Sequence, residues 1–207
     1  MSKKKKIYEN LVSILRTGDV FMNDTKGFLP DSIDTFQKST DNHSGLIIKN
    51  DRLGEISTSE AIGRGVTRRS LRHYILNKKK KYRSISFYRL NSRYTKKKYY
   101  EDVIELQTIL HEGQTGYDFM NLLFFQLVRF AWYNIFGKKI WIGGGEKKGE
   151  KRFICGEWVA YCINKATNLF DKWWQDAPVD VEKSGYFVKI AEIKFNKNGD
   201  IASFYKK

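Results

Sequence analysis

The sequence predicts one α+β domain over residues 1–207, with an antiparallel sheet and helices packed on it. Segments with strand character lie towards both ends of the chain, and segments with helical character lie mainly in the middle. Of the 207 residues, 41% are hydrophobic and 15% are aromatic, which is enough to fill one core. Global disorder and a repeat array are therefore excluded.

The first third of the chain predicts a helix, a strand and a hairpin, in that order. The helix should stop at Gly18, and a polar loop that contains Pro30 should follow the first strand. Asn50-Asp51 supplies the turn of the hairpin. The expected elements are a helix at Tyr8–Leu15, a strand at Val20–Met22, a loop at Asn23–Asn42, and paired strands at Ser44–Lys49 and Glu55–Ala61.

The rest of the chain predicts more helices and a final hairpin. Its most apolar window, Tyr117–Phe136, holds polar residues such as Asp118 and Arg129, so it predicts a buried core helix rather than a membrane span. Asn198-Gly199 predicts the turn of the last hairpin. The expected helices are Thr67–Asn77, Tyr100–His111, Tyr117–Phe136 and Phe153–Phe170, and the expected strands are Ser84–Leu90, Tyr186–Phe195 and Ile201–Tyr205.

The positive charge is concentrated in one segment. The chain carries 38 Lys and Arg against 23 Asp and Glu, a net charge of +15, and residues 64–98 hold fourteen basic residues and no acidic one. We interpret this segment as a basic insertion that would attract an anionic polymer, an anionic lipid or nucleic acid. A solvated basic surface that only keeps the protein soluble is the alternative interpretation.

Several kinds of site are disfavoured by the pattern of cysteine, histidine and glycine. Cys155 and Cys162 are seven residues apart in an expected helix, about 10.5 Å along its axis and too far for a disulfide. Neither H-E-x-x-H nor C-x-x-C occurs, so we expect no metal site and no cofactor. The glycine-rich stretch Gly143–Lys151 does not match the pattern of a phosphate-binding loop.

The N-terminus does not predict export. Lys3–Lys6 resembles the basic start of a signal peptide, but Ile7–Leu15 is interrupted by Glu9, Asn10 and Ser13. We therefore expect cytoplasmic synthesis and no transmembrane segment. The composition, rich in lysine, tyrosine and asparagine, would also suit a phage protein associated with the virion.

Cys155 and His43 are the best candidates for a nucleophile and its base. Cys155 follows a glycine-rich loop and lies at or near the first turn of the expected helix, where unpaired N–H groups and the helix dipole favour a thiolate. A buried core thiol is the alternative for either cysteine, and it suits Cys162 well. His43 opens an apolar strand, whereas His73 and His111 occupy positions that are easily solvated.

Six short motifs occur in a fixed order along nearly the whole chain. They are Gly18-Asp19-Val20, His43-Ser44-Gly45-Leu46-Ile47-Ile48, Glu60-Ala61 with Gly65-Val66, Tyr117-Asp118, Phe153-Ile154-Cys155-Gly156-Glu157-Trp158-Val159, and Pro178-Val179-Asp180. Together they resemble the permuted papain-like amidases, the YaeF/YiiX-like branch of the NlpC superfamily of cysteine hydrolases. The resemblance implies a circularly permuted papain-like fold, in which the histidine strand precedes the nucleophile helix.

The resemblance also implies a role for individual side chains. Cys155 would be the nucleophile, His43 the base and Glu60 the residue that orients the imidazole, with Glu55 as the fallback. Tyr117 would hydrogen-bond near the oxyanion, beside the backbone N–H of Cys155. Gly156 stands where the family usually has serine, and that side chain is not required for attack. Glu157 is left out, because two residues along a helix turn its side chain away from the thiol.

The expected function is hydrolysis of an amide or related acyl bond through a Cys155 acyl-enzyme. The resemblance implies peptide, peptidoglycan-peptide or lipid-linked acyl substrates, and an acyltransferase or thioesterase is the close enzymatic alternative. A basic binding or structural module on the same scaffold is the alternative from another class. In that case residues 64–98 would contact phosphates, and interleaved aromatic side chains such as Phe87 and Tyr94 would stack on bases.

Overall fold

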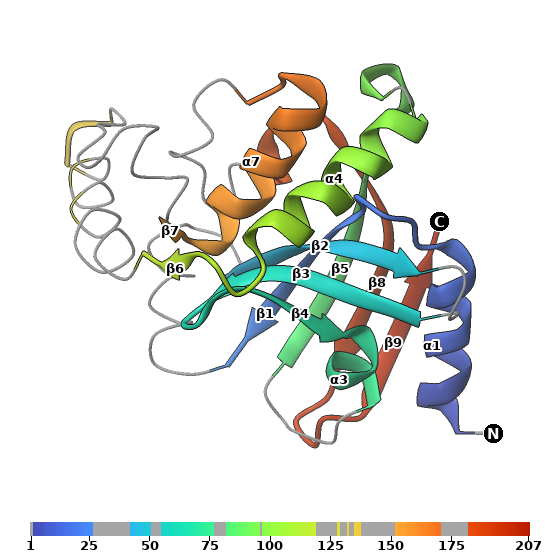
Figure 1. Ribbon diagram of the computed structural model, residues 1–207. Coiled ribbons are helices and arrows are strands. Elements are labelled where there is room, and N and C mark those ends of the chain that lie inside the picture. The colour runs from blue at the N-terminus through green and yellow to red at the C-terminus, as the bar shows by residue number, and fades with distance from the viewer. Residues whose placement is uncertain are drawn as a thin grey trace.

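The computed structural model shows an α+β fold built on an antiparallel sheet (Figure 1). It describes residues 2–26, 42–50, 55–76, 82–95, 97–118, 152–170 and 182–207, together with 128, 132 and 135–137. Seven strands form the main sheet in the order β4-β3-β2-β1-β5-β8-β9, and β6 and β7 form a short parallel pair. The helices are α1 (Lys3–Ile14), α3 (Leu71–Leu76), α4 (Lys97–His111) and α7 (Cys155–Thr167), with a 3-10 turn, η1, at Ser92–Tyr94.

The strands of the main sheet are not all neighbours in chain order, because β5 pairs with β1 rather than with β4. They are β1 (Val20–Thr25), β2 (His43–Asn50), β3 (Glu55–Ile62), β4 (Gly65–Ser70), β5 (Tyr82–Leu90), β8 (Phe187–Phe195) and β9 (Ile201–Lys206), and the short pair is β6 (Gly116–Tyr117) and β7 (Arg152–Phe153). All neighbouring strands of the main sheet pair antiparallel. The expected antiparallel sheet with packed helices is confirmed.

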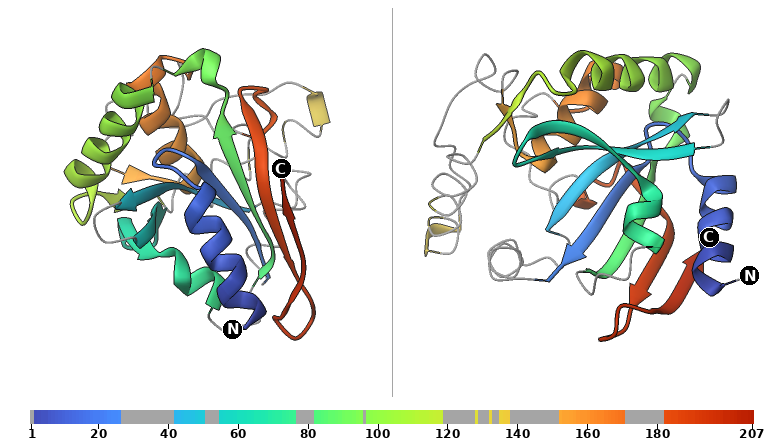
Figure 2. Two further views of the ribbon diagram at one scale, coloured as in Figure 1. Left: turned by 90° about the vertical axis from the view of Figure 1, so that its right-hand side faces the viewer. Right: turned by 60° about the horizontal axis from the view of Figure 1, so that its bottom comes forward.

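Helices cover both faces of the sheet (Figure 2). A hydrophobic core lies on each face of the sheet. Successive residues of β1 point into the two cores in turn, because side chains alternate between the faces of a strand. Val20 and Met22 pack with side chains of α4 and α7, whereas Phe21 packs with side chains of α1 and α3. The sheet is therefore the middle layer, and α7 can present its N-terminus to the strands that it crosses.

Helix α1 is longer than the sequence predicts and ends as expected. It begins after Ser2, whose hydroxyl accepts a hydrogen bond from the backbone N–H of Lys5 at 3.3 Å, and this cap extends the helix over the lysine run. Gly18 follows with φ +85°, and a Cβ there would lie 2.3 Å from the Tyr100 ring. Glycine is thus required at Gly18 by both the backbone and the packing.

The helix expected at Thr67–Asn77 is wrong in its first turn. Residues 65–70 form β4, which pairs along β3, and only Leu71–Leu76 is helical. Gly65, with φ +89°, allows the tight turn between the two strands. Cross-strand pairing overrides the local helical pattern here, because tertiary context outweighs weak propensities.

The basic segment 64–98 contributes β4, α3 and β5 to the fold. Strand β5 lies between β1 and β8, so this segment supplies an inner strand of the sheet. Arg68, Arg69, Arg83 and Arg89 each lie within 4.0 Å of a carboxylate from outside the segment or from the adjacent strand. Within the described residues, these four arginines are therefore divided between β4 and β5 and partly neutralised.

The window Tyr117–Phe136, expected as a buried core helix, lies mostly outside the described residues. Those that are described contradict burial, because Val128, Trp132 and Ile135 are 45%, 40% and 71% exposed. Tyr117 itself belongs to β6. No helix in the described parts of the chain is long and apolar enough to cross a membrane. The Gly143–Lys151 stretch lies outside the described residues.

Candidate active site

His43 is the first residue of β2, at a point where this strand has a neighbour on one side only. It lies opposite Asn23 of β1, but pairing with β3 begins three residues later, at Leu46 opposite Ser59. Gly45 allows the close approach that follows, since a Cβ there would lie 2.8 Å from the Ser59 carbonyl oxygen. The His43 side chain is 19% exposed, so its ring lies at an open edge of the sheet.

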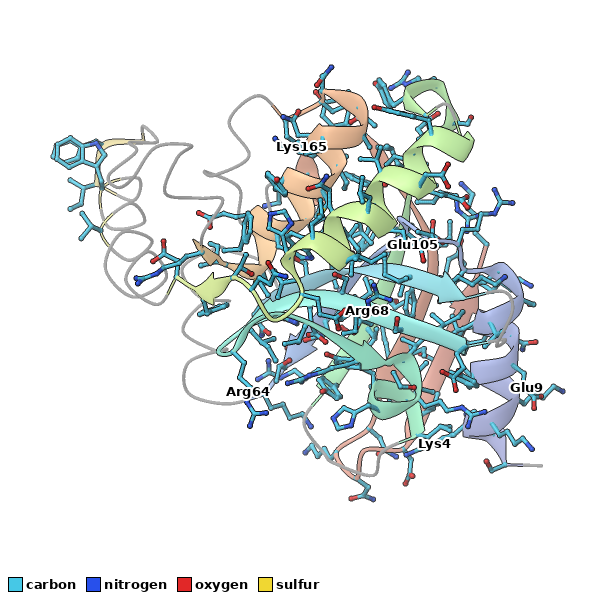
Figure 3. All side chains as sticks on the ribbon, viewed as in Figure 1. Lys4, Glu9, Arg64, Arg68, Glu105 and Lys165 are labelled. Carbon is cyan, nitrogen blue, oxygen red and sulfur yellow. The ribbon has the colours of Figure 1, made fainter. Side chains whose placement is uncertain are left out.

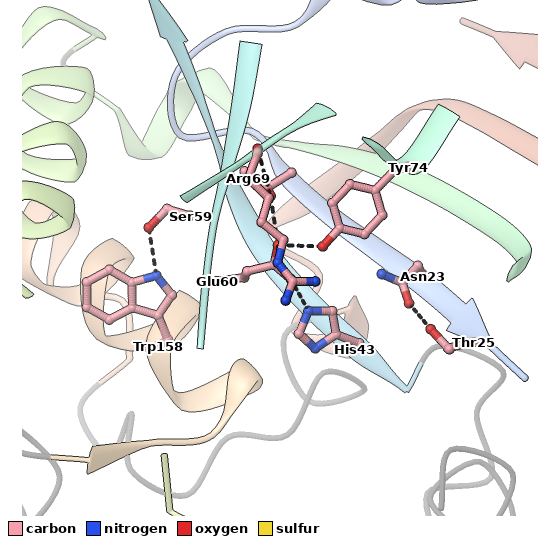
Figure 4. Close-up of polar contacts among 9 residues, drawn as sticks. Asn23, Thr25, His43, Ser59, Glu60, Arg69, Tyr74 and Trp158 are labelled. Carbon is pink, nitrogen blue, oxygen red and sulfur yellow. Dashed lines mark hydrogen bonds and ion pairs between the residues drawn. The ribbon is translucent and has the colours of Figure 1, made fainter. Parts of the chain in front are cut away.

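Glu60 of β3 binds the His43 ring from the neighbouring strand (Figure 4). Its Oε2 lies 2.6 Å from His43 Nε2, and its side chain is only 1% exposed. The other carboxylate oxygen, Oε1, accepts hydrogen bonds from the Tyr74 hydroxyl and, at 2.9 Å, from the Thr58 hydroxyl. A fully buried carboxylate needs such partners, and here they hold it in one orientation.

Cys155 is the first residue of α7, which begins two residues later than the predicted start at Phe153, a residue of β7. Ile154 caps the helix, and its backbone N–H donates to Glu157 Oε2 at 3.0 Å. Glu157 therefore supports the helix N-terminus rather than the thiol. The indole N–H of Trp158 donates to the Ser59 hydroxyl at 3.2 Å and ties α7 to β3 (Figure 4). These contacts fix the position of the Cys155 sulfur over the end of β2.

The Cys155 thiol and the His43 ring interact, since each changes the pKa of the other. Glu60 occupies Nε2 and leaves the other ring nitrogen of His43 for the thiol. The backbone N–H groups of Ser44 and Gly156 also lower the pKa of the thiol. Cys155 is 5% exposed, so the thiol is nearly enclosed beside the more open imidazole.

The charges of this cluster stabilise a thiolate and an imidazolium. Burial raises the pKa of the Cys155 thiol, but the hydrogen bond and charge of His43 and two backbone N–H groups outweigh burial, and the net pKa is lowered from 9.0. Burial lowers the pKa of His43, yet Cys155 and Glu60 raise it from 6.5 to about 10. Burial raises the pKa of Glu60, and His43, Tyr74 and Thr58 lower it overall from 4.5.

The second cysteine has none of these partners. Cys162 lies two turns further along α7, is fully buried, and burial alone raises the pKa of its thiol well above 9.0. Glu55 is exposed at the opposite end of β3, where it pairs with Asn50. The structure thus brings Cys155, His43 and Glu60 together and leaves the fallback residue outside the cluster.

Tyr117 lies close to the thiol through the short parallel pair. It is opposite Phe153, which is separated from Cys155 by one residue. Burial, followed by the charge of Cys155, raises the pKa of the Tyr117 phenol well above 10.0, so the hydroxyl stays protonated and can donate a hydrogen bond.

The sequence did not predict three other residues of the cluster. Thr58 shares a strand face with Glu60 two residues later, so strand periodicity offered a weak signal for it. Tyr74 lies on α3 and Arg69 on β4, with Arg69 Nε 3.9 Å from Glu60 Oε1. No local pattern indicated either, because their positions depend on the turn that folds β4 along β3.

No family model matches the chain, and no curated protein sequence is significantly similar to it. Among solved structures, the chain is similar to the metalloprotein YiiX from Escherichia coli O157:H7. The match has a TM-score of 0.50 and 14% sequence identity, and it covers 84% of this chain and 96% of that chain. At this identity the likeness concerns the fold alone. The fold agrees with the YiiX-like resemblance of the motifs.

Proposed function

We propose that the chain is a cysteine-dependent hydrolase of the permuted papain-like type, acting on an amide or related acyl bond. The observation that carries this proposal is that His43 Nε2 lies 2.6 Å from a buried carboxylate and that His43 lowers the pKa of a cysteine at the start of α7. A thiol at a helix N-terminus, a histidine and an orienting acid form the arrangement that activates a nucleophile. Their order in the chain, with the histidine strand before the cysteine helix, agrees with a permuted fold.

The chemistry follows from where the protons lie. The Cys155 thiolate attacks the carbonyl carbon, and the imidazolium of His43 gives its proton to the leaving group as the acyl-enzyme forms. His43 then takes a proton from water, which attacks the thioester, and the thiolate leaves. Glu60 holds the ring throughout, and the Tyr117 hydroxyl together with a backbone N–H would stabilise the oxyanion. An acceptor other than water would make the same acyl-enzyme an acyltransferase.

The solved structure of YiiX, to which the chain is similar, is that of a metalloprotein. Among the described residues no group of three or more His, Cys, Asp and Glu side chains could hold a metal ion. The donors of the cluster are already used, since Glu60 binds His43, Tyr74 and Thr58. The described residues do not fit a metal, and no step of the proposed reaction uses one.

Among the described residues of the segment 64–98, several arginines have partners within the protein, which counts against a basic binding module. Arg83 lies 2.6 Å from Asp24 and Arg89 lies 2.7 Å from Asp19, so these side chains are paired within the protein. Arg72 and Arg93 lie over the rings of Tyr8 and Tyr94. Cations with internal partners contribute less to phosphate binding than a free basic stripe would.

The test compares the two cysteines of one chain. Iodoacetamide at neutral pH should alkylate Cys155 at least about 100-fold faster than Cys162, because only Cys155 has a stabilised thiolate. Mass spectrometry of the digested protein measures both rates. An activated ester such as p-nitrophenyl acetate should then give a burst of nitrophenolate and an acetyl adduct on Cys155. Equal labelling of the two thiols, or an adduct elsewhere, would contradict the proposal.

A further inference from the structure

Arg69 lies beside the carboxylate that orients His43 (Figure 4). It is opposite Thr58 across the β3–β4 ladder, so its side chain shares a sheet face with Thr58 and Glu60. Its Nε is 3.9 Å from Glu60 Oε1, and its side chain is 41% exposed. A partly open guanidinium therefore lies next to the Glu60–His43 pair.

Arg69 differs from the other paired arginines in how its charge is used. Arg89 and Arg83 approach their carboxylates to 2.7 Å and 2.6 Å, within hydrogen-bonding distance. The 3.9 Å separation at Arg69 is too long for a hydrogen bond. No hydrogen bond joins its guanidinium to any other residue in the described parts of the chain, so its fork of N–H donors is available.

Glu60 does not depend on Arg69 for neutralisation. His43 lies 2.6 Å from Oε2, and the hydroxyls of Tyr74 and Thr58 bind Oε1. The guanidinium therefore adds positive potential at the site beyond what the carboxylate requires. A planar fork of this kind binds carboxylate and phosphate groups in two-point contacts.

We propose that Arg69 selects acyl substrates that carry an anionic oxygen group, a carboxylate or a phosphate, near the bond that is cleaved. This inference rests on the proposed hydrolase function and specifies its substrate class. In this assignment Arg69 is a specificity-determining residue that contacts the substrate. The imidazolium of His43 adds to the same positive potential, and the net charge of +15 favours the approach of anions.

The experiment uses two alkylating probes that differ mainly in charge. Iodoacetate is anionic and iodoacetamide is neutral, and both alkylate the same Cys155 sulfur. The measured quantity is the ratio of the two second-order rates, which cancels changes in the amount of thiolate. In Arg69→Gln this ratio should fall by about fivefold, because one positive charge near the site is lost. The loss should shrink at an ionic strength of about 0.5 M.

Arg68→Gln is the matched control, since it removes the same charge from the neighbouring residue of β4. Arg68 points to the other face of the strand, towards α4, and its Nε lies 3.0 Å from Glu112 Oε2 (Figure 3). Its probe ratio should stay within about twofold of the wild-type ratio. An equal fall in both variants would show a general effect of charge and would overturn the assignment to Arg69.

The outcomes separate this inference from the proposed function. If iodoacetamide labels Cys155 rapidly in both proteins and the ratio is unchanged in Arg69→Gln, Arg69 does not select anions although the nucleophile stands. If iodoacetamide labels Cys155 no faster than Cys162, the hydrolase proposal itself fails. Protection of wild-type Cys155 from iodoacetamide by succinate or by inorganic phosphate, whichever acts at the lower concentration, identifies the preferred anion. That protection should weaken in Arg69→Gln.

Discussion

Asp19 and Glu60 are two buried carboxylates whose pKa values are shifted in opposite directions. Asp19, just before β1, is 3% exposed and binds Arg89 through two hydrogen bonds of 2.8 and 2.7 Å. Glu60, near the end of β3, is fully buried and binds His43 at 2.6 Å. Burial raises the pKa of Asp19 above 3.8 despite Arg89, whereas hydrogen bonds and charge lower the pKa of Glu60 below 4.5 despite burial.

The difference shows that the partner of a buried acid decides whether the pair can take part in proton transfer. The guanidinium of Arg89 stays protonated at every physiological pH, and it also donates to the Ile14 carbonyl, so the Asp19 pair fastens the end of α1 to β5. His43 can gain and lose a proton, and it also contacts a thiol. Asp19 and Arg89 line a cavity of about 550 Å³, but the described residues that line it include neither a histidine nor a cysteine.

Removal of the His43 imidazole should change the reactivity of Cys155 more than any other substitution, and removal of the Asp19 charge should not change it. In His43→Ala the Cys155 thiol loses its main source of stabilisation, so alkylation by iodoacetamide near pH 6 should slow by about 100-fold or more. Asp19→Asn should leave that rate within about twofold of wild type. Alkylation quenched at a series of times, followed by mass spectrometry, measures both rates. A comparable slowing in Asp19→Asn would mean that the two acids do not differ in the way described.

Replacement of the orienting acid should have a smaller effect on the same rate. Glu60→Gln keeps the shape of the side chain, but its uncharged amide stabilises the imidazolium less. The pKa of the Cys155 thiol should therefore rise, and alkylation near pH 6 should slow by about tenfold. The slowing should largely disappear above about pH 9, where the thiol ionises without help. A slowing that persists there would indicate a disturbed structure rather than a changed charge.

Loss of one hydroxyl that hydrogen-bonds to Glu60 should slow the alkylation of Cys155 less than Glu60→Gln does. Tyr74→Phe removes a hydrogen bond to Oε1 and keeps the ring, which packs against Phe21 at a centroid distance of 5.3 Å. Alkylation near pH 6 should slow by about threefold, with the pH profile moved in the same direction as in Glu60→Gln. Tyr74 is thus a positioning residue. A lower rate with an unmoved profile would assign it a purely structural role.

The two acids should also differ in how acid changes the stability of the fold. The pKa of Glu60 is lower in the folded protein than its ordinary value of 4.5. Its contribution to the free energy of unfolding is therefore fully present above pH 4.5 and is lost as the pH falls through the folded pKa. The pKa of Asp19 is higher in the folded protein than its ordinary value of 3.8. Its contribution to the free energy of unfolding is therefore fully present below pH 3.8 and is lost as the pH rises through the folded pKa. The difference in free energy of unfolding between wild type and Glu60→Gln should therefore become smaller on acidification. The corresponding difference between wild type and Asp19→Asn should become larger.

Urea unfolding near pH 7 and near pH 4 measures these gaps, provided that each variant keeps the wild-type m-value. Gaps that move in the same direction for both variants would contradict the assigned pKa directions. This is the smallest of the expected effects, since each variant changes one titrating group in a chain with 23 acidic residues.

Local patterns in the sequence located the centre of the candidate site. A glycine-rich stretch before a helical segment placed Cys155 at or near the first turn of a helix, and α7 begins at Cys155. An apolar run after His43 indicated a strand that it opens, and β2 begins there. These are properties of a few neighbouring residues, so they are readable without a fold. The roles of these residues in catalysis remain predictions.

Tertiary structure decided what surrounds that centre. The hairpin that places Arg69 and Tyr74 near Glu60 is fixed by pairing between β3 and β4, and the local pattern wrongly predicted a helix from Thr67. The basic segment looked continuous in the chain, yet partners such as Asp19 and Asp24 come from β1 or beside it. Charge and residue type belong to the sequence alone. Which charges meet depends on strand pairing between distant segments, and that pairing depends on the free energy of the whole fold rather than on any short pattern.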